Sequence, residues 1–318
     1  MARVAFGPRS SAPSWLWVGY DVACTLREHF DVTFFGPGDM PLADVVFVVK
    51  YPLAPEAATM LKQRGTRIIY APVDYFQSRR HMQQHSNFLR LCDIVALHSE
   101  VVASHLTGLA WSQMVDHYGK YFLDAPPPFK QNGFALWMGA VQNLPYLLHF
   151  LECHRLRIPV RILTNSNCNT GRQAALRVAK RIGIEMRFSR ARINGLEATT
   201  WTAESQAAMM QQAKAAIDIK GSNFNQQTKP PTKAQQFICS GVPLAMNASW
   251  SVTYFEGQGL TVPTPTDPRW LSRDYYLDVL NTAQTLRQKL TLQIIAQQYK
   301  RLIENALGSP QDHSADAH

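Results

Sequence analysis

The chain has 318 residues, of which 46% are hydrophobic and 17% are charged. That hydrophobic share suffices for two cores of ordinary size and argues against a mainly disordered protein. The formal net charge is +9, from 32 Lys and Arg against 23 Asp and Glu, which favours anionic partners such as nucleotides, nucleic acid or acidic lipid headgroups.

The first half of the chain alternates short β-branched runs with helical patterns. Such alternation predicts a parallel sheet with helices on both faces, and the near-continuous apolar strands support it. The predicted strands are Arg3–Phe6, Asp31–Phe35, Val45–Val49, Arg67–Tyr70 and Ile94–Leu97. The predicted helices lie near Tyr20–His29, Pro55–Arg64, Arg80–Leu91 and Glu100–Leu109.

A proline-rich stretch, DAPPPFKQNG at 124–133, then interrupts the alternation and predicts a stiff linker. After it the alternation restarts. The second set of predicted strands is Phe134–Met138, Pro159–Leu163, Ile184–Phe188, Ala215–Ile219 and Val242–Ala245. The predicted helices lie near Asn143–His154, Gly171–Ile182, Ala203–Ala213 and Thr232–Ser240, followed by a long helical stretch at Leu277–Leu307.

These patterns predict two doubly wound α/β domains in tandem. We expect a Rossmann-like domain at 1–124, a linker at 125–133, a second Rossmann-like domain at 134–275, a helical segment at 276–307 and a disordered polar tail at 308–318. Two such domains leave a cleft between them, and ligands of doubly wound folds bind outside the carboxyl ends of the strands.

The segment Lys220–Pro243 (KGSNFNQQTKPPTKAQQFICSGVP) contains the start and end signals of a short helix. Thr232 and Gln235 have the T-x-x-Q spacing of a capping box. Gly241 stands where a left-handed residue would end the helix.

Three lysines, Lys220, Lys229 and Lys233, surround that helix start. A cation in the first turn of a helix is disfavoured by about 0.3–1 kcal/mol, so Lys233 in that position suggests an anion nearby. Helix N-termini bind phosphate through free N–H groups, and the segment therefore predicts a phosphate site. The alternative is a set of ordinary solvated lysines.

Two stretches of the second half resemble a known family. Leu136–Leu148 (LWMGAVQNLPYLL) and Lys229–Pro243 (KPPTKAQQFICSGVP) are similar to the opening strand and to the K-x-x-x-K-x-x-E-x-x-x-x-G-x-P segment of GT-B glycosyltransferases. The likeness is greatest to the retaining family of bacterial polysaccharide and lipopolysaccharide enzymes. It implies two Rossmann-like domains facing a cleft and sugar transfer from a nucleotide-sugar to a glycan or lipid-linked glycan. The transfer would be retaining, metal-independent and hexosyltransferase-like.

The resemblance also implies a donor site. Lys233 would contact the donor diphosphate, and Gly139 would let the backbone approach it. Gln236 and Thr228 stand where the family's E-x7-E pattern has two carboxylates, so a catalytically inactive nucleotide- or sugar-binding relative is the alternative. The donor-binding residues expected on this basis are Gly139, Gln142, Asn143, Lys220, Ser222, Lys229, Lys233 and Gln236.

The acceptor site and any general base are expected in loops after strands of the first domain. Trp17, Gly19 and Asp21 follow the first strand and offer an aromatic platform and a carboxylate; the alternative is a capped helix with packed tryptophans. Asp74, after the fourth strand, is the second candidate base, or else a cap or turn residue. The expected catalytic residues are thus Lys233, Asp74 and Asp21.

No cofactor or metal is expected, because the sequence has no D-x-D segment and no His/Asp/Glu cluster with clear ligand spacing. His98 follows the fifth strand, but the G-x-S-x-G elbow of a hydrolase is missing. Five scattered cysteines, without C-x-x-C spacing, indicate a reducing compartment.

The chain shows neither the apolar run of a signal peptide nor a stretch of 18 apolar residues, so a soluble cytoplasmic protein is expected. Basic residues concentrate at 155–192, which leaves open peripheral contact with anionic membrane lipid at the inner face of the membrane. Nucleic-acid binding ranks lowest because no binding motif accompanies the charge.

Overall fold

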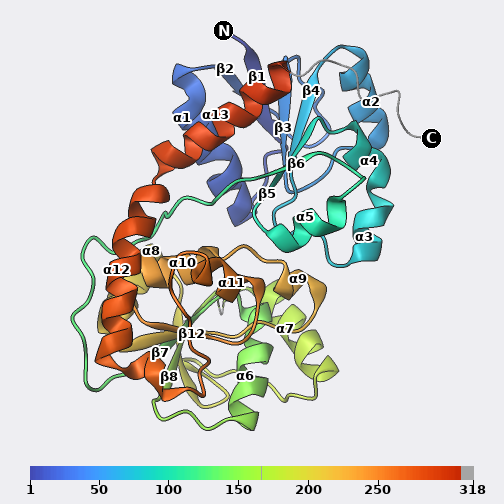
Figure 1. The fold of residues 1–318 in the computed structure, drawn as a ribbon. Helices are drawn as coiled ribbons and strands as arrows, with labels where there is room; N and C mark the ends of the chain where they lie inside the picture. Colours follow the sequence, from blue (N-terminus) through green and yellow to red (C-terminus); the bar gives the residue numbers. More distant parts are fainter. Residues whose placement is uncertain (166, 309–318) are drawn as a thin grey trace. The chain divides into compact units, whose positions relative to one another are not determined.

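The computed structural model describes residues 1–165 and 167–308. The described residues form two compact units, unit 1 from Met1–Tyr118 together with 289–308, and unit 2 from Gly119–Gln288. Each unit contains a six-stranded sheet among the described residues. Helices cover the faces of both sheets (Figure 1). The predicted pair of Rossmann-like α/β sheets is thereby confirmed. The tail expected at 308–318 lies, except for Gly308, outside the described residues.

The sheet of unit 1 is parallel throughout, in the order β2-β1-β3-β4-β5-β6. Its middle strand, VVFVV, is buried at every position, as expected of a parallel strand covered on both faces. The five predicted strands are confirmed, whereas the short polar edge strand β6 was not predicted. The strands are β1 (Arg3–Gly7), β2 (Asp31–Phe34), β3 (Val45–Val49), β4 (Arg67–Ala71), β5 (Ile94–Leu97) and β6 (Ser112–Met114).

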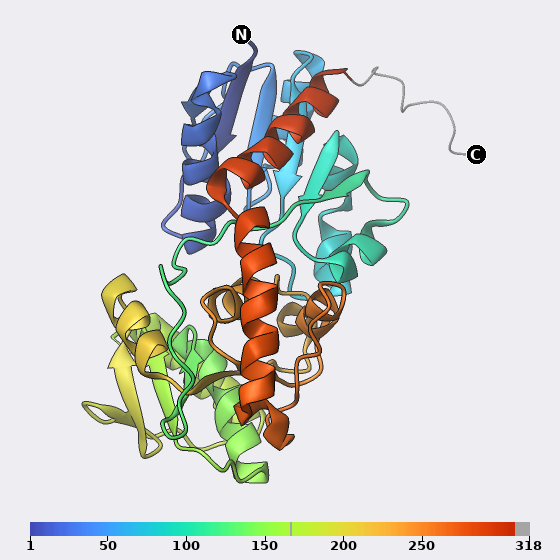
Figure 2. The same ribbon diagram turned by 60° about the vertical axis from the view of Figure 1, so that its left-hand side comes forward.

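Helices α1 and α13 lie side by side on one face of this sheet, and α2 and α4 lie on the other (Figures 1 and 2). The helix predicted at 80–91 is two helices, which meet at His85. The helices of unit 1 are η1 (Trp15–Tyr20, a π-helix), α1 (Asp21–Thr25), η2 (Leu26–Glu28, a 3₁₀-helix), α2 (Pro55–Gln63), α3 (Arg79–Gln84), α4 (Ser86–Leu91), α5 (Glu100–Leu106) and α13 (Leu292–Gly308).

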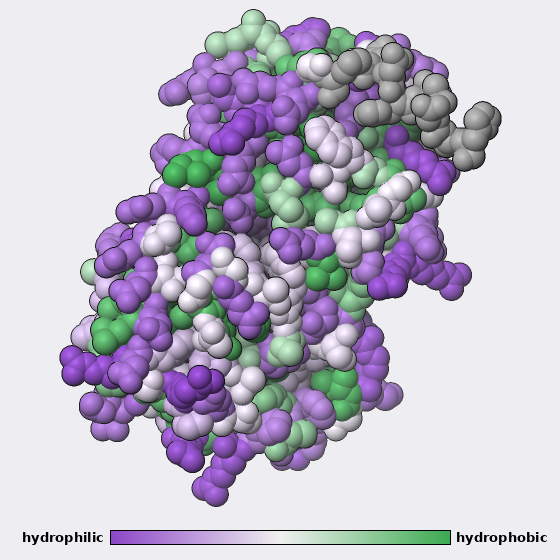
Figure 3. Space-filling view, in the orientation of Figure 1, coloured by the Kyte–Doolittle hydropathy of each residue, from purple (hydrophilic) through white to green (hydrophobic). Residues whose placement is uncertain are grey.

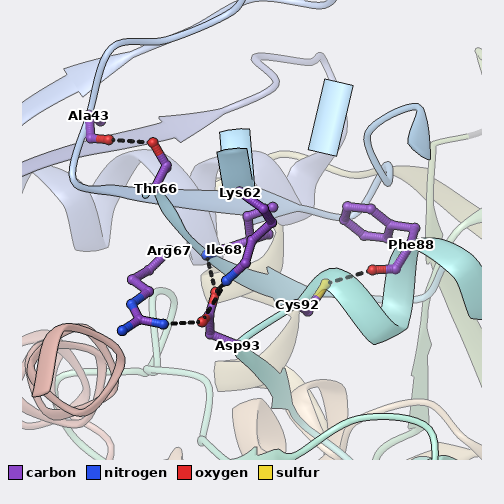
Figure 4. Close-up of polar contacts among 8 residues, drawn as sticks. All are labelled: Ala43, Lys62, Thr66, Arg67, Ile68, Phe88, Cys92 and Asp93. Atoms are coloured by element: carbon purple, nitrogen blue, oxygen red, sulfur yellow. Dashed lines mark hydrogen bonds and ion pairs between the residues drawn. The ribbon is translucent and has the colours of Figure 1, made fainter. Parts of the chain in front are cut away.

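A nearly buried carboxylate joins three segments of unit 1 (Figure 4). Asp93, just before β5, accepts from the Lys62 ammonium of α2 at 2.7 Å and from the Arg67 guanidinium of β4 at 3.0 Å. It also accepts the backbone N–H of Ile68 at 2.8 Å. The carboxylate therefore fixes α2 and the start of β4 against the start of β5.

The sheet of unit 2 has the order β12-β11-β7-β8-β10-β9, parallel except for β9. The strand predicted at Ile184–Phe188 is wrong: a β9–β10 hairpin forms this edge instead. Its turn is Asn194–Gly195, both with positive φ (49° and 80°), and an Asn-Gly turn of this kind is a hairpin signal that the sequence already contained. The strands are β7 (Ala135–Met138), β8 (Val160–Thr164), β9 (Arg192–Ile193), β10 (Leu196–Thr200), β11 (Ala215–Asp218) and β12 (Leu244–Met246).

The long helical stretch predicted at the C-terminus is two helices, α12 in unit 2 and α13 in unit 1. No helix among the described residues is long and apolar enough to cross a membrane. The helices of unit 2 are η3 (Val141–Asn143), α6 (Leu144–Cys153), α7 (Asn169–Arg181), α8 (Ala203–Gln212), α9 (Phe224–Gln227), α10 (Thr232–Cys239), α11 (Trp250–Glu256), η4 (Pro268–Leu271) and α12 (Arg273–Lys289).

Candidate functional site

The candidate site lies at the carboxyl ends of β7 and β11 in unit 2. These two strands are neighbours, and the strand order reverses between them: β8 and β10 continue on one side and β12 on the other. Ligands of doubly wound sheets bind at such a switch point. Gly139 directly follows β7, Asp218 is the last residue of β11, and Lys220 comes two residues later.

A buried ion cluster occupies this switch point. The Asp218 side chain is fully buried and forms ion pairs with the ammonium groups of Lys220, at 3.0 Å, and of Lys233. Burial alone would raise the pKa of Asp218, but the two ammonium groups outweigh burial and hold that pKa at about 2. One carboxylate therefore stands against two cations, and the cluster has a net positive charge.

Lys233 is held in this cluster by several neighbours. Its ammonium lies 5.2 Å from the centroid of the Trp137 ring. A Cβ atom at Gly139 would stand 3.4 Å from the ammonium and 3.1 Å from the Trp137 ring, so the glycine leaves room for both. Burial lowers the pKa of Lys233 to about 8, while the Asp218 carboxylate partly opposes this effect.

Lys220 is fixed through its backbone. Its N–H donates to Asn247 Oδ1 and its carbonyl accepts from Asn247 Nδ2, both at 2.8 Å. Its side chain is only 5% exposed, although Lys is a residue type that is rarely buried without a partner. Lys220 and Lys233 were predicted from the sequence, whereas Asp218 was not, although a carboxylate ending an otherwise apolar strand (AAID) was a signal for it.

Lys229 joins a second group of predicted donor-site residues. Asn143 Oδ1 accepts from Gln226 Nε2 at 2.8 Å and lies 3.4 Å from the Lys229 ammonium. Asn143 follows β7 at the start of α6, and Lys229 precedes α10, so two loops of the carboxyl edge meet here. Gln142 and Ser222, also predicted, are exposed residues of the same two loops.

The predicted capping box of α10 does not form. Pro231 occupies the N-cap and has no polar side chain to bond the N–H groups of the first turn. Gln235 instead donates from Nε2 to the hydroxyl of Tyr254 at 3.0 Å. Gly241 ends the helix with φ 73°, as predicted.

Gln236, one turn after Lys233, has a buried side-chain amide. Its side chain is 2% exposed, and neither amide atom has a hydrogen-bond partner within the described part of the chain. Leaving a buried donor and acceptor unmatched is costly, and polar ligands satisfy such groups. The Thr228 hydroxyl, by contrast, donates to the Phe224 carbonyl at 2.9 Å within α9.

The predicted acceptor residues of unit 1 are brought together in part. The Tyr118 hydroxyl donates a short hydrogen bond to Asp21 Oδ2. The Trp17 ring lies 6.3 Å from the ring of His117, the residue before Tyr118. Gly19 has a packing role, because a Cβ atom there would stand 2.5 Å from the ring of Trp15.

Asp74 is exposed in the turn between β4 and α3 and has φ 52°. It does not cap α3, since Ser78 accepts the N–H of His81 at that helix start. Its charge acts on His98, the residue after β5, whose ring lies 4.0 Å from the ring of His117. Burial lowers the pKa of His98 to about 4, and the hydrogen bond to the Val115 carbonyl and the Asp74 charge partly oppose this effect.

No family model matches the chain, and no curated protein matches it by sequence. Solved structures do match it, and they define its fold as that of GT-B glycosyltransferases. Sucrose-phosphate synthase from Thermosynechococcus elongatus is similar at TM-score 0.64 and 11% identity, over 96% of this chain and 99% of that one.

AviGT4, a glycosyltransferase involved in avilamycin A biosynthesis, is similar at TM-score 0.56 and 13% identity, over 96% of this chain and 98% of its own. The α,α-trehalose 6-phosphate synthase from Burkholderia multivorans has a TM-score of 0.55 and 12% identity, over 82% of this chain and 70% of its own. The resemblance read from the sequence is thus confirmed for the fold.

Proposed function

We propose that the protein is a glycosyltransferase that moves a sugar from a nucleotide-sugar donor to a glycan or lipid-linked glycan acceptor. The observation that carries the proposal is the Lys220–Asp218–Lys233 cluster at the switch point of unit 2. A net cation beside an uncapped helix start suits a diphosphate. The GT-B fold supports the same function.

The cluster would act on the leaving group. As the bond to the sugar breaks, negative charge develops on the nucleotide diphosphate, and fixed cations stabilise that charge without having to reorganise. Asp218 would hold the two ammonium groups in place, and Gly139 would keep the approach open. The unmatched Gln236 amide would bond hydroxyl groups of the donor. In this proposal the transfer is retaining and needs no metal.

Asp21 and Asp74 are the proposed contacts for the acceptor in unit 1. Asp21 already accepts from Tyr118, so a sugar hydroxyl would share its carboxylate with that phenol. Asp74 is exposed and therefore open to an acceptor hydroxyl. If transfer retains the anomeric configuration, the leaving phosphate can take the acceptor proton and neither carboxylate needs to be a strong base.

A panel of UDP-, GDP- and CMP-sugars, together with the free nucleotides, tests the proposal. We expect one nucleotide class to raise the melting temperature and to be consumed when an acceptor is supplied. The matched control is Lys289→Gln, an exposed lysine of α12, beside Lys233→Gln. Absence of protection by every donor and nucleotide would refute the donor site.

The second candidate function is nucleotide or sugar binding without turnover. It rests on Thr228 and Gln236, which replace both carboxylates of the E-x7-E pattern, and on the Thr228 hydroxyl, which is engaged within α9. Saturable binding of a donor with no transfer to any acceptor would favour this function. Measurable transfer would eliminate it.

A basic surface on unit 2 suggests a contact with the membrane that would hold a lipid-linked acceptor. Between Glu152 and Arg192 ten basic side chains stand against two acidic ones, a net +8 of the chain's +9. Arg155 and Arg157 lead into β8, and Lys180 and Arg181 end α7, so these four lie at the amino edge of the sheet, opposite the lysine cluster. In Figure 3, purple hydrophilic side chains project from the lower part of the view, where α6 ends.

We propose that this surface binds anionic lipid at the cytoplasmic face of a membrane. Each Lys or Arg near such a surface contributes about 1 kcal/mol to binding. Sedimentation with phosphatidylserine vesicles, compared with phosphatidylcholine vesicles and with oligonucleotides, tests this. Preference for the oligonucleotide across a salt titration would instead indicate nucleic-acid binding.

A further inference from the structure

We propose that His81, His85 and Tyr75 of unit 1 form a binding site for a divalent transition-metal ion of the Zn²⁺ class. The two histidines are four residues apart, where one turn of a helix separates them. Their Nε2 atoms face each other at 3.2 Å. The site belongs to unit 1 and is separate from the lysine cluster of unit 2.

The separation of the two nitrogens suits chelation. Zn²⁺ binds imidazole nitrogen at about 2.0–2.1 Å with tetrahedral angles, which places two ligating nitrogens about 3.3 Å apart. The observed 3.2 Å between the two Nε2 atoms matches that separation.

Tyr75 supplies the third group. Its hydroxyl lies 3.2 Å from His85 Nε2, and its ring centroid lies 5.1 Å from that of His81. Within the described residues no three His, Cys, Asp or Glu side chains gather around one point, so a third protein ligand here must be of another type. The phenol oxygen meets that need, and water would complete the coordination.

The hydrogen bonds of the cluster are mismatched without an ion. The backbone N–H of Gln77 points at His81 Nδ1 at 3.3 Å, which assigns the His81 proton to Nε2. The Nε2–H of His81 and the O–H of Tyr75 then both face the single lone pair of His85 Nε2. An ion would replace this competition with two nitrogen ligands and one oxygen ligand. The proton on His81 would move to Nδ1, at the expense of the long contact with Gln77.

An ion at this site would order the turn that follows β4. Tyr75 lies in that turn and His81 and His85 belong to α3 and its C-cap, so the ion would tie the turn to the helix. Asp74, one residue before Tyr75, has a left-handed φ of 52° and is the exposed carboxylate of the same turn. The ion would thus fix the backbone that presents Asp74.

Calorimetric titration of the metal-free full-length chain with Zn²⁺ tests the site. The exposed thiols Cys153 and Cys168 are first replaced by serine, because thiolates also bind zinc. We expect one ion per chain, a higher melting temperature, and binding weakened at least about tenfold in His81→Gln and in His85→Gln. His29→Gln, a single histidine elsewhere in unit 1, is the matched control.

A spectroscopic readout keeps the test decisive if a variant folds poorly. Co²⁺ bound to the intact site should give the strong visible absorption of a tetrahedral nitrogen and oxygen site, and Tyr75→Phe should change that spectrum while retaining binding. Cu²⁺ should show hyperfine coupling to two nitrogens. Absence of saturable binding, the octahedral spectrum of aqueous Co²⁺, or unchanged affinity in the two histidine variants would overturn the proposal.

Discussion

At the scale of single residues, Asp218 organises the candidate site. A carboxylate fully buried at the end of a strand would be unstable alone, and its two lysine partners keep it ionised. In return the carboxylate holds two ammonium groups together that would otherwise repel each other. The residues that the resemblance selected, Lys220 and Lys233, therefore depend on one that it did not select.

Replacing Asp218 with Asn should destabilise unit 2 strongly. Removing one partner of a buried ion pair leaves uncompensated charge and costs about 3–5 kcal/mol. Because the folded pKa of Asp218 is about 2, below its unfolded value, the carboxylate stabilises the native state above the unfolded pKa and loses this effect as the pH falls through 4 to 2. Urea unfolding at pH 7 and pH 2.5 measures this; a variant equally destabilised at both would contradict it.

Lys233 should make nucleotide binding depend on pH. Its pKa is lowered to about 8, so its positive charge, and with it the attraction for a diphosphate, is lost as the pH rises through 8. We expect binding of the protective nucleoside diphosphate to weaken between pH 7 and 9 in the wild type. In Lys233→Arg the guanidinium stays charged, so binding should vary less over that range. An identical pH profile in both would remove Lys233 from the site.

At the scale of elements, most of the helices and strands were predicted from hydrophobic periodicity and from the Gly and Pro residues that end them. Nine of the ten strands predicted from apolar, β-branched runs are present in the structure, because parallel strands covered on both faces must be apolar. The strand predicted at 184–188 was wrong: of its apolar residues only Ile184 is buried, and the Asn194–Gly195 turn was overlooked. The cap of α10 was misplaced because Pro231 begins that helix one residue before the expected box.

Within the candidate site, the sequence identified the lysines and Gly139 but could not reveal Asp218 as their partner. Asp218 ends β11 and Lys233 lies in the first turn of α10, 15 residues further along the chain, so the pairing forms only when the helix packs against the strand. The sequence offered no reason to group His81, His85 and Tyr75, because a helix and a preceding turn must pack before their polar atoms converge.

Alanine substitution at two helix-end glycines distinguishes the cost of backbone strain from the cost of steric overlap. Gly241, after α10, has φ 73°, and a Cβ atom there would lie 2.5 Å from Pro126 and 2.9 Å from Leu280. Gly183, after α7, has φ 77° with no described atom within 4 Å of such a Cβ. Gly183→Ala should cost about 1–2 kcal/mol from strain alone, and Gly241→Ala clearly more, because overpacking adds about 1–3 kcal/mol. Equal losses in chemical denaturation would refute the contact argument.

At the scale of the whole molecule, the chain enters unit 1, forms unit 2 and returns to unit 1 in its last helix. The turn at Leu290 and Thr291 divides what the sequence presents as one helical stretch. α13 buries an apolar stripe in unit 1, where the Tyr299 ring stacks on Phe47 at 5.3 Å. α12 instead buries Leu286 in unit 2. Hydrophobic periodicity shows that both helices are amphipathic, but it carries no information on which sheet each covers.

Shortening two side chains thirteen residues apart to alanine should therefore destabilise different units. Tyr299→Ala removes a fully buried ring from unit 1 and Leu286→Ala a fully buried side chain from unit 2, at a cost of about 2–5 kcal/mol each. In hydrogen exchange, Tyr299→Ala should lower amide protection in β3, β4 and β5, and Leu286→Ala should lower it in unit 2. Loss of protection in the same strands for both variants would mean that the C-terminal helices act as one body. Separate losses would establish that unit 1 depends on the end of the chain for its core.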